Sequence, residues 1–159
     1  MSSLEKVVGV DGDRRDTLSK VTGRERFSGD YKVPGALALA IARSTEAHAL
    51  IKNIDSSKAQ ALPGVVRVFT ARDVPGENSY GIIPITKDQP MLAEGKVRFK
   101  GEAVALVAAE TLEAAREAAA LIRVDYEPLK ASFTPEEALA DGADKIHEKG
   151  NLCFEHDSL

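Results

Sequence analysis

Short apolar runs separated by turn residues make up the central part of this chain. Residues 36–44 are mostly apolar and follow Pro34-Gly35, which predicts a buried strand rather than a helix. Residues 48–54 alternate loosely between apolar and polar side chains, and residues 65–69 are rich in β-branched side chains. Both patterns are typical of strands, because branched side chains pack well on a pleated surface. The pattern therefore predicts three strands in the first half of the chain.

Helix signals appear in three places between and after these strands. Residues 57–60 have the spacing of a capping box, in which the Ser57 hydroxyl accepts a helix amide and the Gln60 side chain bonds back. Residues 111–121 form an amphipathic pattern that begins at the potential cap Thr111. Alanines on its apolar face predict a close approach to a sheet. Residues 134–137 complete a second capping box, with proline at the first helical position.

Two further strands are expected on either side of the turn at Lys100-Gly101. Residues 97–99 and 103–109 are apolar and strand-sized, and the turn between them predicts that they pair with each other. Residues 103–109, 111–121 and 123–126 together predict a strand–helix–strand unit in the second half of the chain. The whole pattern predicts a mixed α/β (α+β) domain with a small mixed sheet and packed helices.

Residues 76–90 show no clear period. Glycine or proline interrupts them at Gly76, Gly81, Pro84 and Pro90. The segment is therefore expected to form a long exposed loop, and loops of this length in compact domains are often functional.

Length and composition indicate an ordinary globular protein. The chain has 159 residues, 43% apolar and 29% charged, with 21 basic and 25 acidic side chains. A net charge of -4 without a basic block gives little support to a nucleic-acid groove. The apolar runs are too short to span a membrane. The single cysteine, Cys153, excludes an internal disulfide framework and a four-cysteine iron–sulfur site, and favours a cytoplasmic location.

The candidate metal and acid–base residues are scattered along the sequence. His48, His147 and His156 lack the helical pairing of a zinc motif, and Cys153 near His156 lacks an evident third group to orient a nucleophile. Glu102 follows Gly101 at the start of a strand, where its expected role is to bond turn amides or a neighbouring domain. No glycine pattern forms a phosphate-binding loop. We therefore expect no catalytic, cofactor-binding or metal-binding residue in this chain.

Seven short motifs follow one another in a fixed order between residues 20 and 129. They are Lys20-Val21-Thr22-Gly23, Val33-Pro34-Gly35, Arg43-Ser44 with Ala47-His48-Ala49, Leu62-Pro63-Gly64-Val65-Val66-Arg67-Val68, Thr70-Ala71-Arg72-Asp73-Val74-Pro75-Gly76, Val97-Arg98-Phe99-Lys100-Gly101-Glu102 and Val124-Asp125-Tyr126-Glu127-Pro128-Leu129. Each alone is ordinary turn chemistry. In this order they resemble the large subunits of the molybdenum hydroxylases, which include xanthine dehydrogenase, aldehyde oxidase and carbon monoxide dehydrogenase.

The resemblance implies a particular domain and its partners. It indicates the α/β hammerhead domain at the start of the molybdopterin-binding subunit, at residues 19–142. Residues 1–18 would then be an N-terminal arm, and 143–159 a tail leading toward a molybdopterin-binding domain. In such oxidoreductases molybdopterin carries the chemistry, while FAD and 2Fe-2S clusters on other domains or subunits remove electrons. The molybdenum-activating glutamate and the pterin loops of the family lie further downstream, so none is expected here.

The resemblance also gives the 76–90 loop two interpretations. In the family the corresponding loop helps to shape the channel to the molybdenum centre. Tyr80, Ile82, Ile83 and Pro84 are unusually apolar for a solvated loop, so they could line this channel or pack on a partner domain or subunit. Three interpretations of the whole chain stay open: a fragment of a larger subunit, a separately encoded subunit, or a free-standing interaction or small-molecule-binding module with the same fold.

Overall fold

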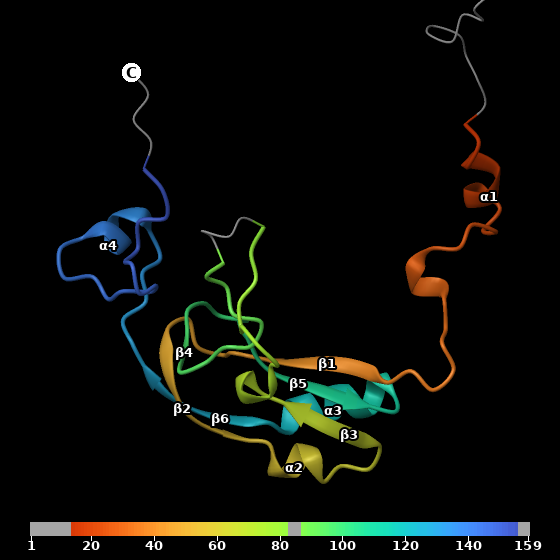
Figure 1. Ribbon diagram of the computed structural model, residues 1–159, viewed down its shortest axis with the longest axis horizontal. Helices are drawn as coiled ribbons and strands as arrows, with labels where there is room; N and C mark the ends of the chain where they lie inside the picture. The colour runs from red at the N-terminus through yellow and green to blue at the C-terminus, as the bar shows by residue number, and fades with distance from the viewer. Residues whose placement is uncertain (1–13, 83–86, 156–159) are drawn as a thin grey trace, which may run out of the picture. The chain divides into compact units, whose positions relative to one another are not determined.

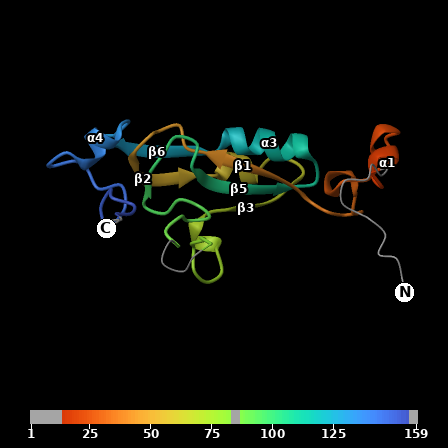
Figure 2. The same cartoon turned by 90° about the horizontal axis from the view of Figure 1, so that it is seen from above.

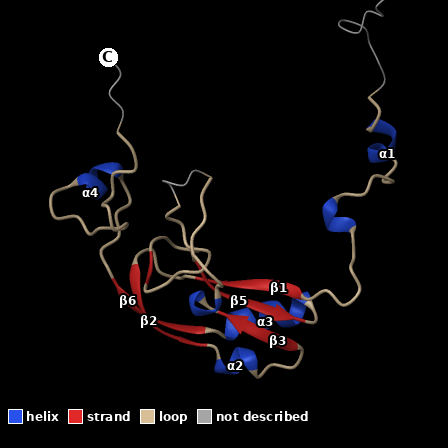
Figure 3. Ribbon diagram, viewed as in Figure 1, coloured by secondary structure: helices blue, strands red, loops and turns tan. Residues whose placement is uncertain are grey.

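Six short strands are divided between two antiparallel sheets (Figure 1, Figure 3). The computed structural model describes residues 14–82 and 87–155. The first sheet has the order β1-β5-β3 and the second the order β4-β2-β6. The strands are β1 (Ala38–Arg43), β2 (Ala49–Asp55), β3 (Val65–Phe69), β4 (Lys96–Val97), β5 (Ala103–Ala109) and β6 (Arg123–Pro128). The predicted mixed α/β class is confirmed, with two small sheets in place of one.

The chain divides into two compact units, residues 1–36 and residues 37–159. The first contains the one-turn helix α1 (Thr17–Val21) and the 3-10 turn η1 (Ser28–Asp30). Within it, the Ser19 hydroxyl donates to Glu25 Oε2 at 2.5 Å. The second unit contains both sheets and all the buried apolar side chains described below.

The main core forms where helix α3 (Leu112–Leu121) packs on one face of the β1-β5-β3 sheet (Figure 2). Ala115 and Ala118 are fully buried on this helix, and Ala105 and Val107 are fully buried on β5. The short helix α2 (Ser57–Gln60) adds the buried Ala59 to the same cluster. Since alanine carries only a methyl group, the helix backbone can lie close to the strands. The close approach predicted from the alanine face is confirmed.

The predicted pairing of residues 97–99 with 103–109 is wrong. Strand β4 pairs with β2 in the second sheet, whereas β5 pairs with β1 and β3 in the first. A hydrogen bond to a residue distant in sequence holds the turn between them, since the Gly101 amide donates to the Ser44 carbonyl at 2.9 Å. Gly101 has a φ of 91°. This left-handed conformation favours glycine. The turn therefore carries the chain from one sheet to the other rather than closing a hairpin.

Two of the three predicted helix caps are confirmed, and one is wrong. The Thr111 and Thr134 hydroxyls accept amides at the starts of α3 and of α4 (Pro135–Leu139). Ser57 does not cap α2, because it is the first residue of the helix itself, and its amide donates to the Asp55 carboxylate at 2.9 Å. Gln60 bonds forward to β3 instead, where its Oε1 accepts the Val68 amide at 3.0 Å. The local spacing of residues predicted the helix correctly. The Gln60 side chain, however, bonds a residue of β3 and not its own helix.

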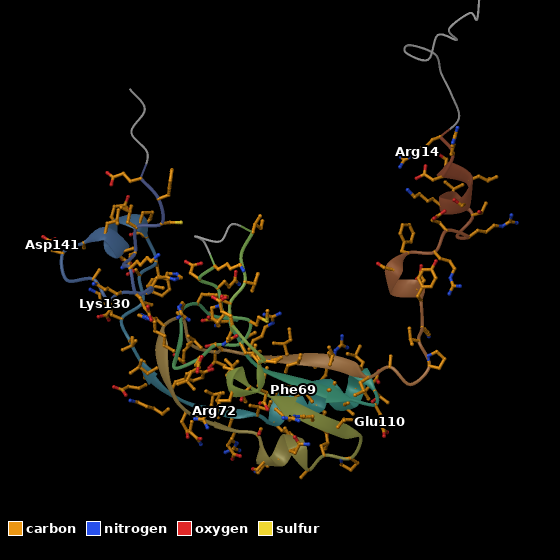
Figure 4. The ribbon with its side chains drawn as sticks, viewed as in Figure 1. Arg14, Phe69, Arg72, Glu110, Lys130 and Asp141 are labelled. Carbon is orange, nitrogen blue, oxygen red and sulfur yellow. The ribbon has the colours of Figure 1, made fainter. Side chains whose placement is uncertain are left out.

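One asparagine holds the segment after β6 together through hydrogen bonds, although the sequence of this segment gives no clear sign of a compact structure. Asn151 Oδ1 accepts the Ile146 amide at 2.8 Å, and Asn151 Nδ2 donates to the carbonyls of Ala138 and Asp144 at 2.9 and 3.0 Å. Figure 4 marks Lys130 and Asp141 on this segment. No helix in the described ranges is long and apolar enough to cross a bilayer.

The alanine contact between α3 and the first sheet gives a direct test of the core. Ala118→Leu adds three carbon atoms to a fully buried position, so it should destabilise the chain by about 1–3 kcal/mol through overpacking. Chemical denaturation measures this change. Ala120→Leu places the same substitution on an exposed position of the same helix and should alter stability little. Equal stability of the two variants would contradict a close-packed helix–sheet contact.

Candidate functional site

The loop between β3 and β4 is anchored at its base by Asn78. Asn78 Nδ2 donates to the Leu92 carbonyl at 2.8 Å, and Asn78 Oδ1 accepts the amides of Met91 and Leu92 at 3.1 and 3.2 Å. The Tyr80 amide donates to the Gln89 carbonyl at 2.9 Å, which forms an isolated antiparallel bridge. These four bonds join the two arms of the loop, so its base has a defined geometry.

The predicted apolar residues lie beyond this anchored base. Tyr80 is half exposed and Ile82 is fully exposed, while Ile83 and Pro84 lie outside the described residues. Figure 2 shows the loop, coloured green, on the side of the first sheet opposite to α3. The sequence therefore predicted the exposure of Tyr80 and Ile82. It missed Asn78, although asparagine is a frequent turn residue because its side chain bonds nearby backbone groups.

Glu102 is buried at the turn that leads from β4 to β5. One carboxylate oxygen accepts the Arg98 amide at 2.5 Å, and the other lies 3.5 Å from the Arg98 guanidinium Nη1. The prediction that Glu102 bonds turn amides is confirmed. Lys96 lies on the same segment, and its Nζ donates to the Lys145 carbonyl at 2.8 Å. Burial, followed by the charge of Arg98, holds the pKa of Lys96 below its ordinary value.

His48 makes the backbone contact that the sequence predicts. Its Nδ1 lies 2.9 Å from the Lys130 carbonyl, and its own carbonyl accepts the Leu129 amide at 2.9 Å. The first contact places the proton on Nδ1, because a carbonyl oxygen only accepts. Figure 4 labels Lys130 on the segment that follows β6. His48 is almost completely buried, and this bond ties the start of β2 to the segment that follows β6.

The remaining candidate residues do not come together. Cys153 is exposed, and His156 lies outside the described residues. His147 Nδ1 lies 3.5 Å from Asp88 Oδ2, and both side chains are largely exposed to solvent. Within residues 14–82 and 87–155, no three histidine, cysteine, aspartate or glutamate side chains gather as metal ligands. These donors do not fit a molybdenum centre, so we assign no step of a reaction to them.

The sequence and fold now identify the family. Residues 22–130 match the family described as aldehyde oxidase and xanthine dehydrogenase, a/b hammerhead domain. The chain belongs to this family. It is 41% identical over 147 residues to the nicotinate dehydrogenase large molybdopterin subunit of Eubacterium barkeri, covering 92% of this chain and 34% of that protein. It is 43% identical over 139 residues to a probable xanthine dehydrogenase subunit of Bacillus subtilis, covering 87% and 18%.

A solved structure supports the same assignment. Quinoline 2-oxidoreductase from Pseudomonas putida 86 superposes with a TM-score of 0.79 at 40% identity, covering 91% of this chain and 19% of that one. The predicted hammerhead fold is therefore confirmed. The chain spans about a third of the length of the first of these relatives and under a fifth of the other two.

The anchored loop gives a local test. Asn78→Ala removes three hydrogen bonds from the loop base, so amide exchange at Met91 and Leu92 should become faster by about tenfold or more. Tyr80→Phe is the matched control, because it keeps the ring and the backbone amide that bonds Gln89. Hydrogen exchange measured by NMR separates the two variants. Unchanged exchange in Asn78→Ala would show that the loop base is held by other contacts.

Glu102 gives a test of the turn between the sheets. Glu102→Gln keeps the side-chain shape but removes the charge that faces Arg98, so it should destabilise the chain by about 1–3 kcal/mol. Glu110→Gln changes the same group at an exposed position and should have little effect. Urea unfolding of both variants is the measurement. A neutral result for Glu102→Gln would mean that shape alone sets the turn.

Proposed function

We propose that this chain serves as the non-catalytic hammerhead domain in the molybdopterin-binding part of an oxidoreductase. Family membership and the similarity to relatives support this role, since the nicotinate dehydrogenase relative is named as a molybdopterin subunit. FAD and iron–sulfur partners on other domains or subunits, and a cytoplasmic location, are part of the same proposal.

The observation that carries the proposal is the exposed isoleucine on an anchored loop. Ile82 is fully exposed, and the bonds of Asn78 and Tyr80 fix the base from which it projects. Exposed apolar side chains on a defined loop favour a contact surface, because contact removes their area from water. In the assembled enzyme we therefore propose that Ile82 contacts a partner domain or subunit, where it either lines the substrate channel or only packs on the partner.

Assembly should protect the loop, and this can be measured directly. Amide exchange across residues 78–82 and 87–92 should slow by about tenfold or more when the chain is part of the assembled enzyme. Ile82→Asp should weaken assembly strongly, because it buries an unpaired charge at the contact. Val66→Asp is the matched control, since Val66 is also exposed but lies on β3. Unchanged loop exchange after assembly would contradict the contact.

A kinetic measurement separates channel lining from simple packing. If Ile82 lines the channel, Ile82→Ala should raise KM severalfold with little change in kcat, because it removes binding that substrate and transition state share. If the loop only packs on its partner, assembly should weaken while KM stays constant. Saturable binding of a small molecule by the isolated chain would instead support the free-standing module.

A further inference from the structure

Strand β1 forms one border of the first sheet and has an open edge. It pairs with β5 on one side, and on its other side no strand lies among the described residues. Its sequence, Ala38-Leu39-Ala40-Ile41-Ala42-Arg43, contains neither proline nor an internal charge. Natural sheets usually protect their edges with such residues, because unpaired backbone groups accept another strand.

A groove runs along this open edge between β1 and helix α3. It has a volume of about 660 Å³, which lies within the range of about 300–1,000 Å³ typical of ligand clefts. Leu39 and Ile41 belong to the part of β1 that lines it. Their side chains, 56% and 43% exposed, lie on the face of the sheet opposite to α3, because Ile41 pairs with Leu106 whereas Ala105 and Val107 face the helix. Leu112 and Ala119 line it from α3. Figure 2 shows α3 running beside β1 and β5.

The charges of the groove have one sign. Arg43 and Arg116 both line it, and no aspartate or glutamate does among the described residues. Arg43 donates to the Gly101 carbonyl at 2.9 Å, a neutral acceptor that leaves its charge uncompensated. These uncompensated positive charges favour an occupant with acidic side chains.

We propose that this groove binds an extended acidic strand, which adds to the edge of β1 as a fourth strand of the sheet. Its backbone would pair with the open edge, and one row of its alternate side chains would pack on Leu39 and Ile41. The other row would lie on the face of the sheet that carries α3, where its carboxylates would pair with Arg116 and Arg43. A strand fits the open edge better than a small molecule, because it can bond the unpaired backbone groups of β1.

The source of the added strand depends on the function proposed above. We assign it to polypeptide outside the region that this chain matches in its relatives, which are about three to five times longer. The groove and the loop containing Ile82 share no residue. The test of strand binding can therefore fail while the loop contact holds, and the reverse is equally true.

The test uses a synthetic peptide and the full chain. The peptide has about six residues of alternating valine and glutamate with both ends blocked, which matches the length of β1. NMR titration should give saturable shifts at Leu39 and Ile41 and slower amide exchange along β1. A peptide with central proline lacks a donor, and one with lysine for glutamate has the wrong charge. Each should bind about tenfold more weakly or worse.

Variants of the chain locate the site. Ile41→Lys should abolish peptide binding, whereas Val66→Lys on the opposite edge strand should leave it unchanged, since Val66 is 52% exposed. Arg116→Glu should reverse the preference between the glutamate and lysine peptides. This reversal cannot arise from simple loss of folding, so it keeps the test valid if Ile41→Lys is unstable.

Several results would overturn the proposal. If the NMR titration gives no saturable shifts, or if the proline peptide binds equally well, β1 does not accept an added strand. Shifts confined to β3 would place binding at the other edge. Dimerisation through β1 without peptide, detected by analytical ultracentrifugation, would assign it to a second copy.

Discussion

The close contact between helix α3 and the first sheet depends on small side chains. Ala115 and Ala118 from the helix meet Ala105 and Val107 from β5, and all four are fully buried. A larger side chain at any alanine would move the helix away from the strands, because protein interiors have little free volume. The position of α3 then sets one wall of the groove beside β1. The core and the proposed binding surface therefore share one structural cause.

The turn at Gly101-Glu102 connects this core to the second sheet. Gly101 adopts a left-handed conformation and donates to Ser44, while Glu102 accepts the Arg98 amide from the preceding strand. These contacts direct the chain from β4 to β5 across two sheets. Buried carboxylates are costly unless bonded, so the use of Glu102 as an acceptor is well matched to its burial. The described parts of the loop, residues 76–82 and 87–92, belong to neither sheet.

Much of this arrangement could be predicted from local sequence patterns. The strand at Val65–Phe69 and the caps at Thr111 and Thr134 were correct, because short-range chemistry determines them. The pairing of residues 97–99 with 103–109 was wrong, since partner choice depends on contacts distant in sequence. Gln60 shows the same limit, because its side chain bonds β3 instead of its own helix. The functional residues were predicted less completely. Glycine and proline interruptions in residues 76–90 predicted an exposed loop, and Ile82 is exposed on it. The role of Asn78 at its base and the groove beside β1 emerged only from the structure. Edge position depends on strand order, which alternation of side chains does not determine.

We propose that this chain folds around its own core and contributes structure to a molybdenum enzyme without carrying the metal. Joint measurement of molybdenum, pterin and amide protection on the purified chain tests it most directly. The account predicts strong protection of the β5 amides with molybdenum and pterin far below one per chain. Stoichiometric molybdenum, or a chain that protects these amides only when molybdopterin is supplied, would contradict it.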